Sequence, residues 1–590
     1  MPINRREFIR NAAALPFAAA PTGLLAATDH PIAPVPPIDP SKIHPSEFDN
    51  ADLDMPYALV HFARVANSIL LDGPDRGWIS LSVWRGLNNC HWYDARVMEN
   101  ILSLAWFYTT RRPWNPYRGN AELRYRLELA LRFWCSIQSD EGRFSEYGPQ
   151  QWNLAATSFA VKFMAESLRL FKSGPPIAPD VHQRAIDCCR KALRAVLFDA
   201  DLYAHGRSYS NQYTNIFAGG AAFLALYPDA ELSKQLRNRL EASPTELQSP
   251  CGYMYEHDGP DLGYTLNTHH ENLRMAYNYW RHNALGAILI EEENRFGRWL
   301  SYNALPEPGQ DFFVLNRSIE TRQKHAIYPP IDTALADRCI IMRAFATSPE
   351  LRAKQIEAAR QELDKNWPTV APLEVGVFET YGPYRFLQRS NYNWHPSAEQ
   401  MREARRLVRP LAEESFVEQM KDTREPIVFT YIRRPGYYAA FASAPQPISA
   451  QQRLGLTFVW TPSTGVLLQS QTAGRETAWG TASSASGGGS LPVEANGLAA
   501  EYSDGGAAVR YPLPGGGQKS LEFAQDRIRV TVERTGAIVE RVPVFSPACV
   551  ASSAQSTVKQ QDDSPVPGKT LSVVELEAQD KLEYEIRPEA

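Results

Sequence analysis

The stretch Ile427-Val428-Phe429-Thr430-Tyr431-Ile432 marks the point at which the character of this chain changes. Its β-branched and aromatic residues are typical of a β-strand. Similar short segments follow, separated by turn clusters rich in Gly, Ser and Pro, at residues 456–460, 465–468, 528–532 and 571–576. The sequence therefore predicts an antiparallel β-domain over residues 426–590, preceded by a linker at 409–425.

Before this change, apolar residues recur with helical spacing. In residues 121–137, Leu123, Leu127, Leu131 and Trp134 fall on one face of a helix. Comparable segments occur at residues 96–108, 154–171, 181–197, 216–227, 232–241, 272–290 and 331–346. These helices share no regular repeat, which disfavours a short-period solenoid. Residues 51–408 are therefore predicted to form an array of antiparallel helices, either a bundle array or an incomplete α/α toroid.

The order of the elements and the overall composition narrow the fold class. A chain of 590 residues is longer than one hydrophobic core usually supports. Helices precede strands and do not alternate with them, so a parallel nucleotide-binding sheet is not expected. The net charge of -5 gives no sign of a nucleic-acid binder. We expect a multi-domain chain, α then β: an incomplete toroid followed by an antiparallel β-sheet or β-sandwich domain.

The N-terminus resembles a twin-arginine export signal over residues 1–27. Arg5 and Arg6 precede a weakly apolar run at 11–20, which is too short and too rich in Ala for a good membrane span. A Pro-rich segment at 28–50 is predicted to be a tether. We expect export to the periplasm or beyond and no membrane span in the mature chain. The alternative is a disordered basic tail.

Metal and disulfide chemistry have little support in the sequence. The seven cysteines are scattered, odd in number and without zinc-ligand spacing. His269 and His270 are adjacent, so on a helix their side chains diverge, and no HExxH pattern is present. We expect buried thiols, no metal and no cofactor.

Three predicted loops concentrate polar and aromatic residues: 140–152, 208–215 and 253–272. Within them, Gly142-Arg143-Phe144-Ser145-Glu146-Tyr147, Asn211-Gln212 and Gly259-Pro260-Asp261-Leu262-Gly263-Tyr264 resemble the helical region of heparinase II/III-like polysaccharide lyases. That family has an α/α toroid and a C-terminal antiparallel β-domain. The resemblance implies β-elimination on an acidic, uronic-acid-containing polysaccharide. It also implies that Asn211 neutralises the uronate carboxylate and that Tyr264 serves as base or acid.

The required chemistry agrees with these residue types. Removal of the C5 proton of a uronate requires a group that neutralises the adjacent carboxylate and stabilises the enolate-like charge that develops. Asn211, with Gln212 beside it, is suited to this. A tyrosine such as Tyr264 needs nearby cations to act as a base, because its ordinary pKa is about 10. In the alternative interpretation Asn211 is a helix cap and Tyr264 a packed wall residue.

Residues 316–328 offer cations and a second proton carrier. Arg317 and Arg322 are candidates for contacts with carboxylate or sulfate groups. His325 is the candidate third catalytic residue, with His395 as its competitor. The remaining predicted subsite residues are Glu146, Tyr147, Trp152, Tyr253, Tyr255 and His269. The β-region lacks the Gly-His-x-Asp element of many such lyases, so a metal there is not expected.

Two other functions remain open at this point. Glu256 and Asp261, with Glu146, are a possible acid and base pair for a glycoside hydrolase, which helical toroids also support. Asp261 is equally interpreted as a brace of its own turn, because Asp side chains readily bond nearby backbone. A non-catalytic carbohydrate-binding relative is the second alternative.

Overall fold

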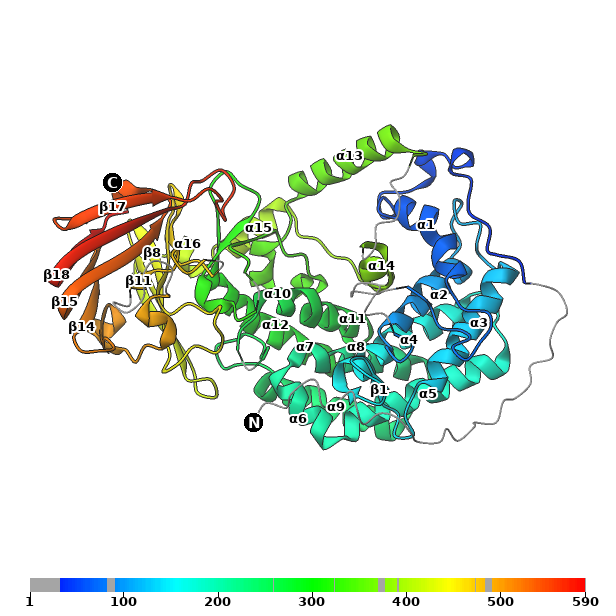
Figure 1. Ribbon diagram of the computed structural model, residues 1–590. Coiled ribbons are helices and arrows are strands. Elements are labelled where there is room, and N and C mark those ends of the chain that lie inside the picture. Colours follow the sequence, from blue (N-terminus) through cyan, green and yellow to red (C-terminus); the bar gives the residue numbers. More distant parts are fainter. Residues whose placement is uncertain are drawn as a thin grey trace.

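The structure is a computed structural model that describes residues 32–81, 91–257, 259–322, 324–369, 377–389, 392–472, 474–482 and 491–588. The predicted export signal, the first residues of the predicted tether and Asp258 lie outside this range. In Figure 1 the helices occupy one side of the molecule and the strands the other.

The helical part consists of two layers. Helices α2 (Ile101–Thr109), α4 (Leu154–Ser173), α8 (Asn215–Leu226) and α11 (His270–Trp280) contact one another in succession and form the inner layer. The outer layer is α3 (Ala121–Ser136), α5 (Pro179–Phe198), α9 (Ala230–Glu246) and α12 (Ala284–Asn303). Each inner helix also contacts the outer helix that follows it in sequence. This arc of α-hairpins confirms the predicted incomplete α/α toroid.

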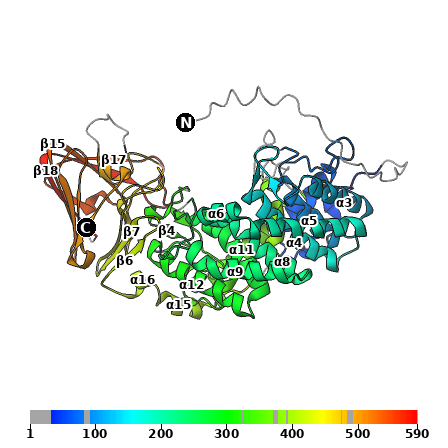
Figure 2. The ribbon, with the colours of Figure 1, turned by 90° about the horizontal axis from the view of Figure 1, so that it is seen from below.

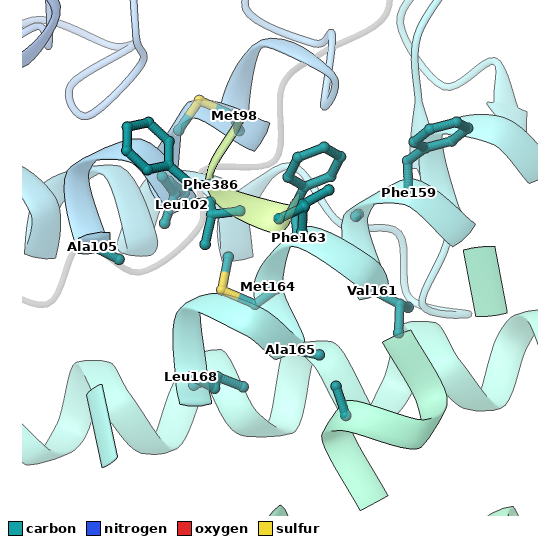
Figure 3. Close-up of a cluster of buried hydrophobic side chains, with 14 of the residues drawn as sticks. Met98, Leu102, Ala105, Phe159, Val161, Phe163, Met164, Ala165, Leu168 and Phe386 are labelled. Atoms are coloured by element: carbon teal, nitrogen blue, oxygen red, sulfur yellow. The ribbon is translucent and has the colours of Figure 1, made fainter. Parts of the chain in front are cut away.

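Helix α4 is the most enclosed member of the inner layer. Asn153 caps it by accepting a hydrogen bond from the Ala156 amide, and nearly all of its residues are buried. Figure 3 shows Phe163, Met164 and Leu168 of α4 in one cluster with apolar side chains of α2 and with Phe386. Phe386 belongs to α14 (Val377–Gln388), so a distant segment of the chain closes this core. Helix α4 is enclosed although it also carries the charged residues Lys162 and Glu166 in its buried part.

The remaining helices are shorter or peripheral. They are α1 (Met55–Asn67), α6 (Ala200–Ser208), α7 (Ser210–Tyr213), α10 (Leu262–Tyr264), α13 (Pro349–Asn366), α15 (Ala398–Arg405) and α16 (Arg409–Ala412). A π-helix, η6 (Thr265–His269), joins α10 to α11. Within residues 91–109, a 3₁₀ turn, η5 (Val97–Asn100), precedes α2 and continues into it.

Two predicted helices differ from the structure. The predicted helix at 272–290 is divided into α11 and α12, because Asn283 accepts a hydrogen bond from the Leu285 amide and starts a new helix. The predicted helix at 331–346 consists of 3₁₀ turns, η8 (Ala334–Asp337) and η9 (Ile340–Phe345). Small antiparallel sheets also occur within the helical region: β1 (Phe144–Ser145) with β2 (Trp152–Asn153), and β3 (Ala304–Pro306), β4 (Phe313–Leu315) and β5 (Ile327–Tyr328).

The C-terminal part is one curled antiparallel sheet, which confirms the predicted order of an α region followed by a β region (Figures 1 and 2). Its main path runs in the order β12, β13, β14, β15, β10, β9, β8, β7, β6, and β18 pairs with β15. The strands are β6 (Phe416–Asp422), β7 (Ile427–Arg434), β8 (Tyr437–Ser443), β9 (Gly455–Thr461), β10 (Gly465–Gln469), β11 (Gly480–Thr481), β12 (Glu501–Ser503), β13 (Ala508–Pro512), β14 (Gln518–Phe523), β15 (Ile528–Val544), β16 (Val550–Ser552), β17 (Gln555–Gln560) and β18 (Ser572–Ile586).

The sheet begins earlier than predicted. Strand β6 lies inside residues 409–425, which the sequence assigns to a linker. Its buried positions, Phe416, Met420 and Asp422, alternate with polar residues, and the charged residues among them conceal the strand pattern. The boundary at residue 408 also does not separate the hydrophobic cores. Trp299 and Leu300 of α12 share a core with the sheet, apart from the core of the toroid.

The helical and β parts are joined by a buried carboxylate. Asp422, at the end of β6, is fully buried and accepts hydrogen bonds from the hydroxyls of Ser249 (2.5 Å), Tyr253 (2.7 Å) and Tyr255 (3.0 Å). The backbone amide of Arg424 also donates to it at 2.8 Å. Tyr253 and Tyr255, predicted to line subsites, therefore lie in the interior and attach the segment before Glu256 to the sheet. The physical reason is that a buried carboxylate must be hydrogen-bonded, and these phenols are its donors.

Two further observations concern membrane spans and cysteines. Within the described residues, no helix combines the length and the apolar character of a membrane span. The cysteines at 135, 188, 189, 251, 339 and 549 are free thiols.

Asp422→Ala tests the junction. Three buried hydroxyls lose their common acceptor, so we expect the free energy of unfolding to fall by about 3 kcal/mol or more. Denaturant titration measures this, with Asp562→Ala, a change at an exposed position, as the control. Equal stability of the two variants would contradict the proposed role of Asp422.

Candidate functional site

Asn211 is held by a buried carboxylate. It lies in α7, directly after a segment in which Tyr209 pairs with Glu256 in an isolated β-bridge. The fully buried Glu256 accepts hydrogen bonds from the Ser210 hydroxyl (2.9 Å), the Asn211 backbone amide (2.7 Å) and the Asn211 side-chain nitrogen. This arrangement fixes the orientation of the Asn211 amide. That nitrogen carries two N–H groups, one of which is donated to Glu256, and the Asn211 residue as a whole is only 3% exposed.

Glu256 is in a strongly perturbed environment. Burial raises the pKa of its carboxyl to about 8, although the hydrogen bonds from Asn211 and Ser210 act in the opposite direction. At neutral pH this favours a carboxyl group that adds no negative charge behind Asn211. An anionic ligand can then approach the amide without repulsion from Glu256.

A ladder of aromatic rings stands beside Asn211. The Tyr209 hydroxyl shares a hydrogen bond of 2.7 Å with Nδ1 of His257, and the two rings stack at 5.4 Å. His205 stacks on the other face of Tyr209 at 4.6 Å, and its Nε2 lies 3.2 Å from Oε1 of Gln212. His257 has a φ of +52°, a backbone conformation that is uncommon for residues other than Gly and that clusters at functional sites.

The sequence reasoning missed this ladder. No catalytic or binding role is predicted from the sequence for His257, Tyr209 or His205. The signal in the sequence that could have indicated this ladder is the position of His257 directly after Glu256. The contact between His257 and Tyr209 joins residues 48 apart in the chain, so the order of residues does not reveal it.

Tyr264 has a cation beside its phenol. The Asp261 carboxylate caps α10 by accepting a hydrogen bond from the Tyr264 backbone amide at 2.9 Å. Arg322 donates from Nη2 to the Tyr264 hydroxyl at 3.2 Å, and its guanidinium lies 4.2 Å from the ring centroid. A cation in this place stabilises negative charge on the phenol oxygen. Helix α7, which carries Asn211, contacts η6, the π-helix that begins directly after Tyr264.

Behind Tyr264 is a buried group of charged residues. Burial raises the pKa of Asp261 to about 6 and that of Glu320 to about 8, and the two residues pair through their backbones. Arg317, predicted to bind substrate, is fully buried and donates to Thr472 of the β part. Burial lowers the pKa of Arg317 to about 10, and its interaction with Glu320 acts in the opposite direction.

The other predicted residues are distributed between surface and interior. His325 is exposed, and its ring packs edge-on to Tyr328, whose hydroxyl donates to Asn267 at 3.1 Å. Burial of its ring and the charge of Arg317 lower the pKa of His325. His395 is also exposed but contacts Arg352 and not the Tyr264 group.

Of the predicted subsite residues in the first and third loops, only some are accessible. Tyr147 is 63% exposed and Trp152 is half-buried. Glu146 is buried, 3.9 Å from the Arg96 guanidinium. His269 is buried in η6, and within the described residues neither of its ring nitrogens has a hydrogen-bond partner. Burial lowers the pKa of His269, so its ring is neutral at neutral pH.

The β part forms one wall of the site. A pocket of about 250 Å³ is lined by His257, by Glu425, Pro426 and Ile427, and by residues of the loop after β8: Ala444, Gln446, Pro447 and Ile448. Gly259 packs so closely against this loop that a Cβ atom would lie 2.6 Å from Ile448 Cδ1. Glycine is therefore required where the Tyr264 loop meets the sheet. Among the described residues, no group of His, Cys, Asp and Glu is arranged to hold a metal ion.

Comparisons with known proteins give likenesses of fold. The sequence matches no family model and no curated protein. Three solved structures are similar over most of the chain. Heparan sulfate lyase HepC from Pedobacter heparinus shares 10% identity over 87% of this chain and 79% of its own, with a TM-score of 0.47. Chondroitin AC lyase from Streptomyces coelicolor A3 shares 11% identity over 94% and 80%, with a TM-score of 0.48. A heparinase III shares 10% identity over 93% and 85%, with a TM-score of 0.49.

Two of these proteins are named as lyases and the third as a heparinase. The sequence itself resembles heparinase II/III-like polysaccharide lyases. At this level of identity the likeness concerns the fold, and the chemistry of this chain rests on its own residues.

Glu256→Gln tests the carboxyl behind Asn211. The pKa of Glu256 is raised from 4.5 to about 8 in the folded state, so the folded protein retains a proton that the unfolded chain releases. Its contribution to stability is present below about pH 4.5 and is lost as the pH rises through about 8. We expect the variant to lose less stability than the wild type between pH 5 and pH 8, measured by denaturant unfolding.

Glu350→Gln, at an exposed position, is the control and should keep the wild-type dependence. If Glu256→Gln also keeps it, the raised pKa of Glu256 is refuted.

Proposed function

We propose that this protein is a polysaccharide lyase that cleaves a uronic-acid-containing glycan by β-elimination. The observation that carries the proposal is the Arg322 cation on the Tyr264 phenol, directly before η6, which contacts the helix that holds Asn211. Together they supply the two functions that removal of a uronate C5 proton needs, a base and a group that neutralises the carboxylate.

Asn211 and Gln212 would bind the carboxylate of the uronate. An amide N–H donated to this carboxylate stabilises the negative charge that moves onto it as the C5–H bond breaks. The buried Glu256 holds the amide in place, and its raised pKa limits the negative charge behind it. A preoriented donor in a site partly closed by the β part is worth more than one in open water.

Tyr264 would accept the C5 proton. In the ionised form its oxygen is stabilised by the Arg322 guanidinium, 3.2 Å away. As the C5–H bond breaks, the C4–C5 double bond forms and the C4–O bond breaks. The departing oxygen takes a proton from the newly protonated Tyr264, or from His257, which is coupled to the Tyr209 hydroxyl. His325, the histidine that the sequence favoured, is a third donor candidate on the neighbouring segment.

The geometry gives less support to hydrolysis. The carboxylates proposed for a glycosidase, Glu146, Glu256 and Asp261, are each no more than 1% exposed. Glu256 and Asp261 are further occupied by Asn211 and by the cap of α10. A general acid must come within hydrogen-bond distance of the glycosidic oxygen, and Glu256 and Asp261 are already engaged as acceptors within the protein.

Tyr264→Phe and Asn211→Ala test the mechanism. We expect Tyr264→Phe to reduce turnover about 100-fold or more, because only the proton-carrying hydroxyl is lost. Asn211→Ala should reduce it by roughly two to three orders of magnitude. The assay is the ultraviolet absorbance of the unsaturated uronate formed from heparin, chondroitin, hyaluronan, alginate, ulvan or glucuronan, compared with the release of reducing ends.

Tyr227→Phe, a change at a half-buried tyrosine to which no role in the site is assigned, is the matched control. Reducing ends without absorbance would indicate a hydrolase. Binding without either signal would indicate a carbohydrate-binding protein.

We also propose that the protein is exported by a twin-arginine route, on the basis of Arg5 and Arg6 before the apolar run. Replacing both by Lys should retain the protein in the cytoplasm, as measured by cell fractionation. Equal distribution of wild type and variant would refute the proposal.

A further inference from the structure

An accessible stripe leads away from Tyr264 along α10, η6 and α11. Tyr264, Asn267, Glu271, Arg274 and Asn278 recur at intervals of three or four residues, and each is at least partly exposed. Asn272, Leu273, Met275, Ala276 and Tyr277 are buried. Arg274 is ten positions after Tyr264, which corresponds to about 15 Å along a helix axis. Partly exposed residues therefore occur at short intervals between Tyr264 and Arg274.

At Arg274 the stripe reaches a pocket of about 330 Å³. Its lining comes from the segment before α1, the loop after α2, α11, α14 and the loop near residue 393. In Figure 1, α14 lies between α1 and α11. The lining residues are Ala51, Asp52, Asp54, Arg112, Arg274, Arg385, Arg389 and Asn393.

The charges in this lining do not cancel. Four guanidinium groups face two carboxylates of the lining, and Glu271 lies 3.5 Å from Arg274, which leaves an excess of one positive charge. Asp52 is shared between Arg112 (2.8 Å) and Arg389 (2.6 Å), so both of its oxygens are occupied. Asp54 is likewise shared between Arg389 and Arg385.

Arg274 is the least compensated of the four. It donates to the carbonyl oxygen of Asp332 at 3.1 Å and lies 3.5 Å from Glu271 on its own helix. Within the described residues, its buried Nε has no hydrogen-bond partner, and the same holds for Nε of Arg389. Burial, together with the charge of Arg389, lowers the pKa of Arg385. Guanidinium groups with unused N–H donors around a pocket suit an oxyanion, which they bind in bidentate geometry.

We propose that this arginine pocket is an anion subsite that binds a carboxylate or sulfate group of the glycan, away from the bond that is cleaved. The inference rests on the proposed function only for the nature of the glycan. Long chains that reach from Tyr264 to the pocket gain this contact, and short ones do not. The pocket thus selects for chain length and for the spacing of acidic groups.

The test uses Arg112→Gln/Arg274→Gln in the full chain with Tyr264→Phe, so that bound sugar is not cut. Calorimetric titration with inorganic sulfate, and with short and long oligosaccharides of heparin and of hyaluronan, measures affinity. We expect sulfate and the long oligosaccharides to bind at least about tenfold more weakly than to Tyr264→Phe alone, and the short ones to bind equally. Arg190→Gln, at an exposed ion pair on α5, is the matched control and should change nothing.

The outcomes of these titrations decide whether the arginine pocket binds an anion and which anionic group it binds. A loss for heparin alone assigns the subsite to sulfate, and a loss for both glycans assigns it to carboxylate. Unchanged affinity with a lower melting temperature would mean that the arginines are structural and would overturn the proposal. If the double variant does not fold, Arg274→Lys replaces it: weaker sulfate binding supports the proposal, because the bidentate fork is lost, and unchanged binding overturns it.

The result is separable from the proposed lyase activity. A wild-type protein that yields no unsaturated product but binds sulfate through these arginines refutes the activity and keeps the subsite. A protein that yields the product with unchanged sulfate binding in the variant keeps the activity and refutes the subsite.

Discussion

The buried Asp422 carboxylate connects the two halves of the structure. Its oxygens accept the hydroxyls of Ser249, Tyr253 and Tyr255, and this places the segment that carries Glu256 and His257 against the end of β6. A buried carboxylate with hydrogen bonds of this kind tolerates little displacement, because each lost bond leaves an uncompensated polar group. The loop of the candidate site is therefore supported by the sheet as well as by the toroid. The hydrophobic core that α12 shares with the sheet also connects the helical part to the β part.

Carboxyl groups near the candidate site are kept in the interior, together with Asn211. Burial raises the pKa of Glu256, Asp261 and Glu320, so each of these carboxyl groups carries less negative charge than it would in water. Gln212, Tyr264 and Arg322 remain accessible. This separation suits an anionic ligand, because the repulsion from neighbouring acids is reduced where the ligand would bind.

Much of the fold was open to prediction from the sequence, since it depends on local periodicity. The helices at 121–136 and 154–173 and the strands at 427–434 and 455–461 follow from the spacing of their apolar residues. The failures have local causes as well. Asn283 starts a new helix within an apolar pattern that appears continuous, and the charged residues of β6 conceal a strand. Candidate site residues were harder to predict. Asn211 and Tyr264 were found through motif resemblance, whereas Tyr253, Tyr255 and Arg317 were misplaced because exposure does not follow from residue type.

The sequence by itself determined the order of a helical and a β region, most of their elements, and the presence of Asn211 and Tyr264 in loops at helix junctions. These properties depend on residues close together in the chain. Only the tertiary structure decided that Arg322 meets Tyr264, that Tyr209 meets His257, and that four arginines from three separate segments surround one pocket. Such contacts join residues far apart in the chain, and the energy of a charge or a hydrogen bond depends on distance and burial, which the linear order of residues does not contain.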